Sequence, residues 1–163
     1  MTHNPPSSRV CPTGAPMTFR KGVWYFVEIP SVPEQILEVE EAIIDALSQT
    51  GFPESDVFAV RLAIDEALAN AIKHGNACDP SKKVHIRFCL ENSRVTLAVR
   101  DEGRGFDYRN IPDPTTDDRL ELPCGRGLLL MKSYMDSVSF NEIGNEVTMV
   151  KGRGENHVSD KTA

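Results

Sequence analysis

Residues 66–75 read Glu-Ala-Leu-Ala-Asn-Ala-Ile-Lys-His-Gly, and this stretch gives the first indication of both fold and chemistry. Residues four apart on a helix project from the same face, so Glu66 and Asn70 would present a carboxylate and an amide side by side. The carboxylate can accept a proton, and the amide oxygen suits Mg²⁺, which prefers oxygen ligands. We interpret the pair as a general base beside a metal ligand. Taken singly, each residue would be interpreted as an ordinary solvated helix side chain.

Two glycine-rich clusters follow, and the first reads Asp101-Glu-Gly-Arg-Gly-Phe106. Asp101 ends an apolar run with the pattern of a strand, so its carboxylate could accept a hydrogen bond from an exocyclic amine. Gly103 and Gly105 lack the Cβ that would block a flat ring, and they can adopt positive φ. Adenine satisfies these requirements. A plain Asp-Glu-Gly turn between strands is the alternative, because Gly-x-Gly alone is common.

The second cluster, Gly125-Arg-Gly-Leu128, opens an apolar segment that is expected to be a helix. Free backbone amides and the helix dipole favour a phosphate at a helix N-terminus, so this cluster is predicted to contact a nucleotide. A flexible lid hinge is the alternative interpretation. The chain has neither Gly-x-x-x-x-Gly-Lys-Ser/Thr nor a strand followed by Gly-x-Gly-x-x-Gly, which argues against P-loop and Rossmann sites.

Four further polar residues lie in or near these clusters. Arg104, Arg119 and Arg126 are each able to reach a γ-phosphate, and the sequence does not choose among them. An exposed surface arginine is the ordinary expectation for each. His74, one turn beyond Asn70, is interpreted as a helix-end residue that complements the helix dipole, and it stays outside the predicted catalytic set.

Composition favours a single globular domain and excludes several functional classes. The 163 residues are 40% hydrophobic and 26% charged, which is enough to bury a core. The formal net charge of −6 argues against nucleic-acid binding, which needs dense Lys and Arg. No apolar run reaches membrane-spanning length and the first twenty residues lack the apolar core of a secretion signal, so we expect a cytoplasmic protein. The four cysteines show no zinc spacing, which argues against a structural metal.

Patterning along the chain predicts a flexible arm at residues 1–20, a folded domain at 21–153 and a polar tail at 154–163. Residues 107–124 contain prolines and acids without periodicity, and a loop of this length favours a lid. A capping box, Ser31-x-x-Glu34, is expected to open the first helix. The expected strands are 23–27, 84–90, 94–100, 137–140 and 146–151, and the expected helices lie between 31 and 51, at 55–74 and at 128–135.

The order strand, helix, helix, strand, strand, helix, strand, strand predicts an α+β fold. Tight hairpins at 91–93 and 144–145 favour antiparallel pairing. The helices must bury their apolar stripes against the sheet. We therefore predict a two-layer α/β sandwich, with a mixed, mostly antiparallel sheet covered on one face by three helices.

In their order and separations, the segments 66–75, 101–106 and 125–128 resemble the N, G1 and G2 boxes of the GHKL ATPase superfamily. The resemblance covers residues 25–151. Within this superfamily, the short chain, the Asn-Ala-Ile-x-His-Gly run and the Leu-Met-x-x-x-Met-Asp segment ending at Asp136 are similar to anti-sigma factor serine-protein kinases of the RsbW type. The combination of motifs is far more specific than any one box.

The resemblance implies the Bergerat fold with ATP and Mg²⁺ as cofactors. It implies that Glu66 is the general base, Asn70 the Mg²⁺ ligand and Asp101 the adenine-binding residue. The implied nucleotide contacts are Asn70, Asp101, Gly103, Gly105, Gly125, Arg126, Gly127, Leu128 and Asn145. The family commonly has Gly-Thr where this chain has Gly144-Asn145, so either an amide replaces the hydroxyl or nucleotide affinity is lower. Some second boxes also have a glycine where this chain has Cys124.

The resemblance also implies partners: a sigma factor, a STAS-domain anti-anti-sigma factor that is phosphorylated on Ser or Thr, and a second copy of the chain in a homodimer. No direct nucleic-acid or membrane partner is expected. The first functional hypothesis is an ATP-dependent serine/threonine protein kinase that regulates transcription by partner switching. The second is a nucleotide-gated binding module without phosphoryl transfer. A detached histidine-kinase catalytic domain is the third, although the residues before 55 offer no phosphoacceptor hairpin.

Overall fold

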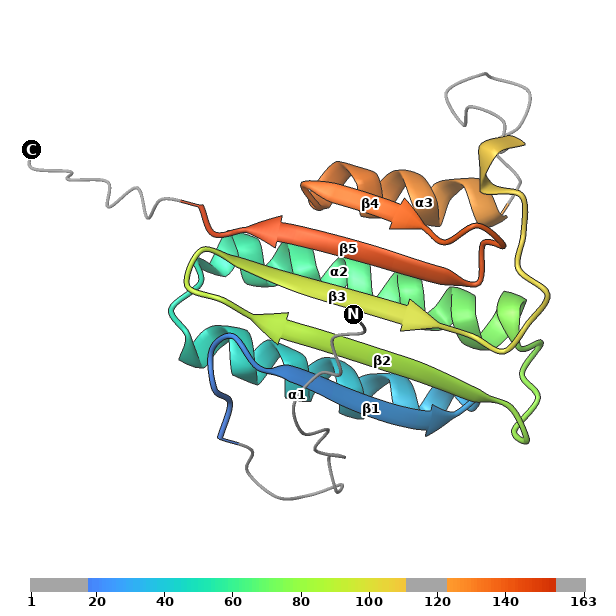
Figure 1. Cartoon of the computed structure of the whole chain (residues 1–163), viewed down its shortest axis with the longest axis horizontal. Helices are drawn as coiled ribbons and strands as arrows, with labels where there is room; N and C mark the ends of the chain where they lie inside the picture. The colour runs from blue at the N-terminus through green and yellow to red at the C-terminus, as the bar shows by residue number, and fades with distance from the viewer. Residues whose placement is uncertain (1–17, 111–122, 155–163) are drawn as a thin grey trace, which may run out of the picture.

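The computed structural model describes residues 18–110 and 123–154, which form a sheet with helices on one side (Figure 1). The strands are β1 (Trp24–Pro30), β2 (Lys83–Leu90), β3 (Arg94–Arg100), β4 (Ser137–Phe140) and β5 (Glu146–Gly152). The α-helices are α1 (Ile36–Gln49), α2 (Glu54–Asn70) and α3 (Pro123–Tyr134). The short helical turns are η1 (Pro33–Gln35), η2 (Ala71–Gly75) and η3 (Tyr108–Asn110).

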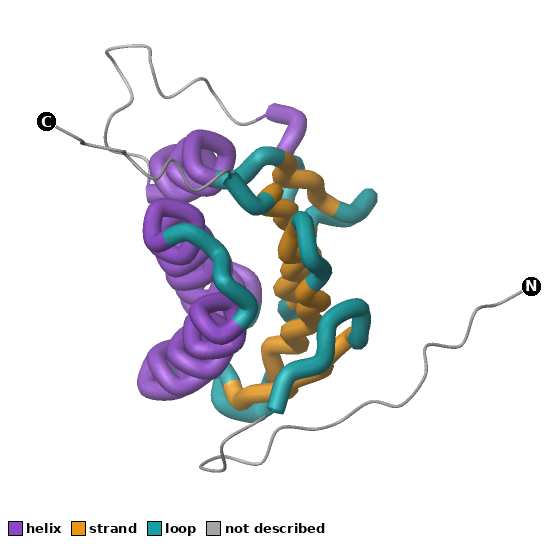
Figure 2. The backbone as a smooth tube through the Cα atoms, turned by 90° about the vertical axis from the view of Figure 1, so that its left-hand side faces the viewer, coloured by secondary structure: helices purple, strands orange, loops and turns teal. Residues whose placement is uncertain are grey.

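The five strands form one sheet in the order β1-β2-β3-β5-β4, and sheet and helices form two separate layers (Figure 2). This confirms the α+β two-layer sandwich. Every pairing among the described strands is antiparallel, which corrects the mixed sheet that was expected. The reason is the path through the helices. A single helix between two neighbouring strands returns the chain in the same direction and gives a parallel pair. Two helices, α1 and α2, separate β1 from β2, so β2 runs antiparallel to β1.

The core lies between the two layers, where alternate residues of each strand face the helices. Val95, Leu97 and Val99 of β3 are buried in this way. They face a helical layer in which Ile64 and Leu68 of α2 have no exposed surface. Each such side chain contributes about 1.5–3 kcal/mol when fully buried. The same packing holds the end of β3, and hence the loop that begins at residue 101, close to the end of α2.

Helix α2 ends one turn earlier than predicted. An α-helix was expected over residues 55–74, whereas the α-helical part stops at Asn70 and the last turn, Ala71–Gly75, is a π-helical turn. Such turns are rare and frequently lie at functional sites. Here the turn brings Gly75 against Asp101, because a Cβ at Gly75 would lie 2.2 Å from the Asp101 Cγ. A Cβ at Gly103 would lie 2.2 Å from the Gly75 carbonyl oxygen, so the two segments touch through their backbones.

The predicted capping box at Ser31 is wrong. Val32 is the N-cap of η1, and no side-chain hydrogen bond caps this turn. Ser31 is fully buried, and its hydroxyl donates to the Lys82 carbonyl at 3.0 Å and accepts from the Asn76 amide at 2.7 Å. The hydroxyl therefore serves a tertiary network, which a local sequence pattern cannot show.

Three predicted segments fall wholly or partly outside the described residues. The arm at 1–20 is described only from residue 18, the tail at 154–163 only at residue 154, and the lid at 107–124 only at 107–110 and 123–124. Pro123 and Cys124 belong to α3, so this helix begins before the predicted end of the lid. The arm, the lid and the tail stay predictions.

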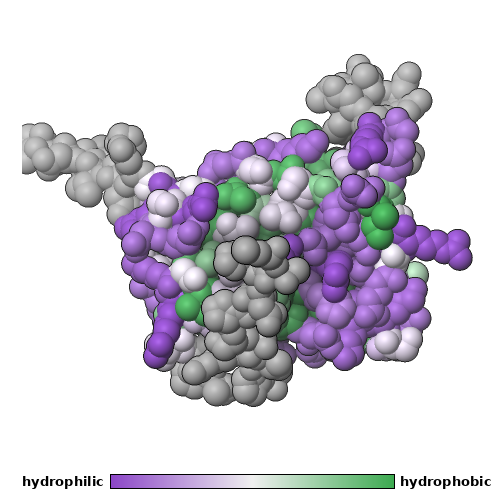
Figure 3. All heavy atoms as spheres, in the orientation of Figure 1, coloured by the Kyte–Doolittle hydropathy of each residue, from purple (hydrophilic) through white to green (hydrophobic). Residues whose placement is uncertain are grey.

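The described surface is polar with scattered large apolar side chains, among them exposed Leu37, Phe58 and Ile143. Hydrophilic residues surround smaller apolar areas on the face that Figure 3 shows. Within the described ranges, no helix is both long and apolar enough to cross a bilayer.

Cys78 is exposed and Cys89 is buried, both as free thiols. No three His, Cys, Asp or Glu side chains of residues 18–110 and 123–154 are grouped as a metal ion would require.

Candidate functional site

A cavity of about 420 Å³ lies between the end of α2, the end of β3, α3 and the β4–β5 hairpin. This volume is typical of small-molecule sites. Six of the nucleotide-contacting residues predicted from the sequence line it: Asn70, Asp101, Gly103, Gly105, Leu128 and Asn145. Glu66, Arg126 and Gly127 are not part of its wall, although Gly127 directly precedes Leu128. The fold thus brings three separate motifs to one cavity.

Asp101 provides a half-buried carboxylate directly after the last residue of β3. The Gly103 N–H donates to its Oδ1 at 2.8 Å, and the Asp101 N–H donates to the Asn145 carbonyl at 3.0 Å. Burial raises the pKa of the Asp101 carboxyl above its usual value, and the hydrogen bond from Gly103 acts in the opposite direction. This bond uses one acceptor site of the carboxylate, and the remaining sites on Oδ1 and Oδ2 can accept a hydrogen bond from an exocyclic amine.

The wall around this carboxylate is largely apolar, and it was not predicted. Val99 and Val147 are buried residues that line the cavity. Phe106 and Phe140 also line it, with their rings edge to face at 5.3 Å between centroids and 82° between planes. Apolar and aromatic surfaces beside one carboxylate suit a purine ring with an amino group. Strand alternation marks the two valines as core residues, and no sequence signal separates a core residue from a cavity wall.

Two glycines with positive φ lock the loop after β3 to the β4–β5 hairpin. Gly105 has φ +76° and Gly144 has φ +78°. A Cβ at Gly105 would lie 1.8 Å from the Ile143 carbonyl oxygen, and a Cβ at Gly144 would lie 2.1 Å from the Phe106 carbonyl oxygen. We predicted that Gly105 would admit a flat ring. In the structure its missing Cβ admits the hairpin backbone, and Gly144 is an equal partner that was not among the predicted site residues.

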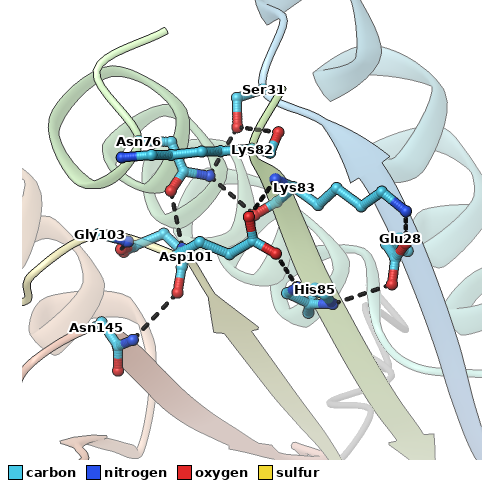
Figure 4. A network of polar contacts seen from close by, with 10 residues as sticks. Glu28, Ser31, Asn76, Lys82, Lys83, His85, Asp101, Gly103 and Asn145 are labelled. Atoms are coloured by element: carbon cyan, nitrogen blue, oxygen red, sulfur yellow. Dashed lines mark hydrogen bonds and ion pairs between the residues drawn. The ribbon is translucent and has the colours of Figure 1, made fainter. Parts of the chain in front are cut away.

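Asn76 is a further residue that was not predicted, and it is fully buried. Its Nδ2 donates to Ser31 Oγ at 2.7 Å and to the Lys83 carbonyl at 2.8 Å. Its Oδ1 accepts from the Glu102 N–H at 2.8 Å (Figure 4). An Asn that follows a helix-ending glycine is easily interpreted as a turn residue. Only the distant partners of this side chain reveal that it supports the loop after β3.

Asn145 lines the cavity as predicted, but both ends of its amide are engaged by the protein. Its Nδ2 donates to the Asp101 carbonyl at 3.1 Å, and its Oδ1 accepts from Asn141 Nδ2 at 2.6 Å. Asn141 Oδ1 in turn accepts from three successive backbone N–H groups of the hairpin, those of residues 144–146. The amide therefore ties the hairpin to the end of β3, and a direct contact with nucleotide stays a prediction.

The other end of the site lies where α2 meets α3. Glu66 and Asn70 are half-buried on α2, and Asn70 lines the cavity. Glu66 lies against α3, because a Cβ at Gly127 would be 1.8 Å from Glu66 Oε1. Since α3 begins at Pro123, the free amides of its N-terminus belong to its first four residues at most, which include Gly125 and Arg126 but not Gly127 and Leu128. These amides and the helix dipole favour an anion.

Among the described residues, the charged ones that line the cavity besides Asp101 are Lys82, Arg104 and Glu146. Arg104 lines the cavity, whereas Arg126 is exposed on α3 away from its wall, and Arg119 lies outside the described residues. Lys82 and His74, which were not predicted as site residues, also line the cavity. The positive charge of Lys82 favours the ionised form of Asp101.

Glu102 points away from the cavity, which leaves Asp101 as the carboxylate of this loop that faces it. The Lys83 N–H donates to Glu102 Oε2 at 3.0 Å, and His85 Nε2 lies 3.1 Å from Glu102 Oε1. The hydrogen bond from the Lys83 N–H, and to a smaller extent the one with His85, holds the pKa of Glu102 below its usual value. Glu28 extends this exposed network through His85 and Lys83 (Figure 4). Exposed ion pairs of this kind contribute little to stability.

The fold and the three motifs around one cavity correspond to a known class of nucleotide-binding domain. Residues 29–151 match the sequence profile of the histidine kinase-like ATPase domain, and the chain belongs to this family. This confirms the superfamily that the three motifs indicated.

Comparison with curated proteins gives a narrower grouping. The chain is 30% identical to the serine-protein kinase RsbW of Bacillus subtilis (strain 168) over 134 residues, which cover 77% of this chain and 82% of that protein. It is 29% identical to RsbW of Bacillus licheniformis over 142 residues, or 82% and 88% of the two chains. An anti-sigma F factor of Anoxybacillus flavithermus is 35% identical over 97 residues, or 56% and 64%. These relatives confirm the similarity to the RsbW type.

A solved structure supports the fold. The crystal structure of the RsbU and RsbW domains of a Mycobacterium tuberculosis protein superposes with a TM-score of 0.55 and covers 80% of this chain. This chain spans about a third of the length of that one, since the match covers 32% of it. At 17% identity the similarity concerns the fold alone.

Proposed function

We propose that this chain is an ATP-dependent serine/threonine protein kinase and anti-sigma factor, which phosphorylates a STAS-domain anti-anti-sigma factor in a partner-switching circuit. The observation that carries the proposal is the placement of Glu66 and Asn70. Asn70 forms part of the cavity wall while Glu66, on the same face of α2, lies against Gly127 of α3. A module that only bound nucleotide would have no use for a carboxylate at this position. The similarity to proteins named serine-protein kinase and anti-sigma factor supports the same interpretation.

The cavity suits ATP in one orientation. The adenine amine would donate to Asp101, and the phosphates would point toward the first turns of α3, where free backbone amides favour negative charge. Asn70 would hold Mg²⁺ through its amide oxygen, since an oxygen donor at the cavity wall fits the ligand preference of this ion. The chemistry supplied by bound Mg²⁺ is neutralisation of phosphate charge.

In the proposed reaction, Glu66 accepts the proton of a Ser or Thr hydroxyl while the hydroxyl oxygen attacks the γ-phosphorus. The bond between the γ-phosphorus and the β,γ-bridging oxygen breaks, which yields ADP and a phosphoester on the partner. The amides of α3 hold the charge of the transferring group. Positioning and electrostatics supply most of the rate acceleration in phosphoryl transfer, and the general base adds about 10²–10⁴-fold.

A sigma factor is proposed as the second partner and a homodimer as the working form. The similarity to an anti-sigma F factor supports the first of these, and a sigma-factor partner would place the chain in the cytoplasm. Light scattering would measure the oligomeric state. Copurification with candidate sigma factors, with and without ADP, would identify the partner.

The test of the kinase proposal is transfer of label from γ-labelled ATP to candidate STAS proteins in the presence of Mg²⁺. Wild type would be compared with Glu66→Gln and Asn70→Ala, and with Asp65→Asn as the control because Asp65 is an exposed neighbour on α2. Transfer to Ser or Thr that the first two variants abolish and the control retains would support the proposal. Nucleotide binding without transfer by the wild type would favour the nucleotide-gated binding module.

A further inference from the structure

Two asparagine side chains from distant parts of the chain hold the peptide unit between Asp101 and Glu102. The Asn145 Nδ2 donates to the Asp101 carbonyl at 3.1 Å. On the other side of the same peptide, the Glu102 N–H donates to Asn76 Oδ1 at 2.8 Å (Figure 4). Both polar groups of this peptide are thus bound by side chains, and neither side chain belongs to the three motifs.

We propose that Asn76 and Asn145 are positioning residues that hold the Asp101 carboxylate in place and thereby set the preference for adenine over guanine. The inference rests on the proposed ATP site, and it adds residues that determine base selectivity. Adenine carries an amine where guanine carries a carbonyl. A carboxylate accepts a hydrogen bond from the amine and repels the carbonyl, so its placement decides between the two bases.

The partners of Asn76 fix the orientation of its side-chain amide. A carbonyl only accepts and an N–H only donates, so the Lys83 carbonyl and the Glu102 N–H fix which end of the Asn76 amide faces which partner. Its third bond, to buried Ser31, anchors the same amide beside the start of the first helical segment. Lys83 is the first residue of β2. The loop after β3 is therefore tied to two elements of the core through one buried side chain.

Asn145 holds the peptide from the hairpin side. Its amide lies between Asn141 and Asp101, with hydrogen bonds of 2.6 Å and 3.1 Å. The backbone of the hairpin adds a second connection, because the Asp101 N–H donates to the Asn145 carbonyl at 3.0 Å. Asp101 is thus held at its N–H, at its C=O and, through the Gly103 N–H, at one carboxylate oxygen.

The consequence is a carboxylate with little freedom to turn. If either asparagine were removed, the Asp101–Glu102 peptide could rotate and the carboxylate could move away from the base. Adenine would then lose its hydrogen bond and guanine would lose the group that repels it. A site built to hydrogen-bond one group rejects an analogue without it, and this discrimination depends on fixed geometry.

The experiment measures the affinities of ADP and GDP by isothermal titration calorimetry for wild type, Asn76→Ala and Asn145→Ala. Asn76 is the sharper probe because it does not line the cavity, so its removal takes away no direct contact with a nucleotide. We expect ADP affinity to fall on the order of tenfold in each variant while GDP affinity stays unchanged or rises, because guanine loses the carboxylate that repels it. The ratio of the two affinities would therefore fall on the order of tenfold or more. Asn92→Ala is the matched control, since Asn92 is exposed in the turn between β2 and β3.

A double-mutant cycle tests whether the effect passes through the carboxylate. In an Asp101→Asn background, Asn76→Ala should leave the ADP to GDP ratio unchanged. A purely structural role for Asn76 would lower the melting temperature and weaken both nucleotides equally, and this result would overturn the proposal. If Asn76→Ala does not fold, the ratio in half-buried Asn145→Ala, compared with and without Asp101→Asn, decides the matter, because Asn145 lines the cavity and an effect that persists without the carboxylate would be a direct contact. If the wild type binds neither ADP nor GDP, the proposed ATP site is overturned as well. If the wild type prefers ADP and the variants have the same ratio of ADP to GDP affinity, only the positioning role is overturned.

Discussion

The two ends of the cavity are built in different ways. At the Asp101 end, the backbone of one loop interlocks with the backbone of a hairpin through Gly105 and Gly144. At the Glu66 end, a side chain of α2 lies against the backbone of α3, where Gly127 leaves room for the carboxylate. The proposed base recognition therefore depends on how the backbone is folded, whereas the proposed transfer step also depends on the Glu66 side chain of α2. Substitutions at the two ends should fail in different ways.

The largest expected effect is that of Glu66→Gln at the helical end. Glutamine has the size of glutamate but cannot accept the proton, so phosphoryl transfer to the partner should slow by about 10²–10⁴-fold. ADP affinity and melting temperature should stay near the wild-type values, because the substitution changes one half-buried side chain and leaves the backbone of α2 and α3 in place. Single-turnover kinetics measure the rate of phosphoryl transfer, and calorimetry measures ADP affinity and the melting temperature. Asp65→Asn serves as the control. Loss of ADP binding in Glu66→Gln would show that the Glu66 end contributes to nucleotide binding as well as to transfer.

At the backbone end, Gly105→Ala should act on folding. Its Cβ would meet the Ile143 carbonyl oxygen at 1.8 Å and its φ of +76° is unfavourable for alanine, so we expect a loss of about 3 kcal/mol or more in the free energy of unfolding. Gly22→Ala is the control. Gly22 has a φ of +75°, but a Cβ added there would have no atom within 4 Å, so only the backbone strain of about 1 kcal/mol applies. Urea unfolding of both variants gives the comparison, and equal losses would contradict the interlocked arrangement.

The same contrast explains what could be predicted from the sequence. The placement of Asn70 and Asp101 at one cavity could be predicted from residue type and spacing, and the fold class followed from the order of elements. The roles of Glu66, Asn70 and Asp101 stay predictions. Asn76 was not identifiable, because its partners, such as Ser31, come from segments up to 45 positions away. The π-helical turn after α2 and the fully antiparallel sheet were also missed. Both depend on how distant segments meet and not on a local pattern.

A smaller effect is expected when the carboxylate itself is changed. Asp101→Asn keeps the size of the side chain and removes its charge, so ADP affinity should fall by about 10–100-fold, the usual range for one charge-assisted hydrogen bond. Calorimetric titration with ADP measures this loss. Asp45→Asn, on the exposed face of α1, is the matched change of charge and should leave the affinity at the wild-type value. An unchanged affinity in Asp101→Asn would remove the carboxylate from the proposed adenine contact.

The smallest effect concerns stability without nucleotide. Burial raises the pKa of Asp101 above its usual value of 3.8, so the folded protein retains a proton at pH values where the unfolded chain has released it. The ionised carboxylate is therefore unfavourable to folding at neutral pH, and this penalty is relieved as the pH falls through the raised pKa. Asp101→Asn should accordingly be more stable than wild type at neutral pH, and the difference should narrow on acidification. Urea unfolding over this range measures it.

Glu102→Gln provides a control of opposite sign in the neighbouring residue. The hydrogen bond from the Lys83 N–H, followed by His85, lowers the pKa of Glu102, so its ionised form favours the folded state. Its contribution is present above the ordinary glutamate pKa and is lost as the pH falls through the lowered value. Glu102→Gln should thus be less stable than wild type at neutral pH, with a gap that closes in acid. The two variants should therefore shift the free energy of unfolding in opposite directions at neutral pH. A shift in the same direction would contradict the conclusion that the ionised Asp101 carboxylate destabilises the folded protein.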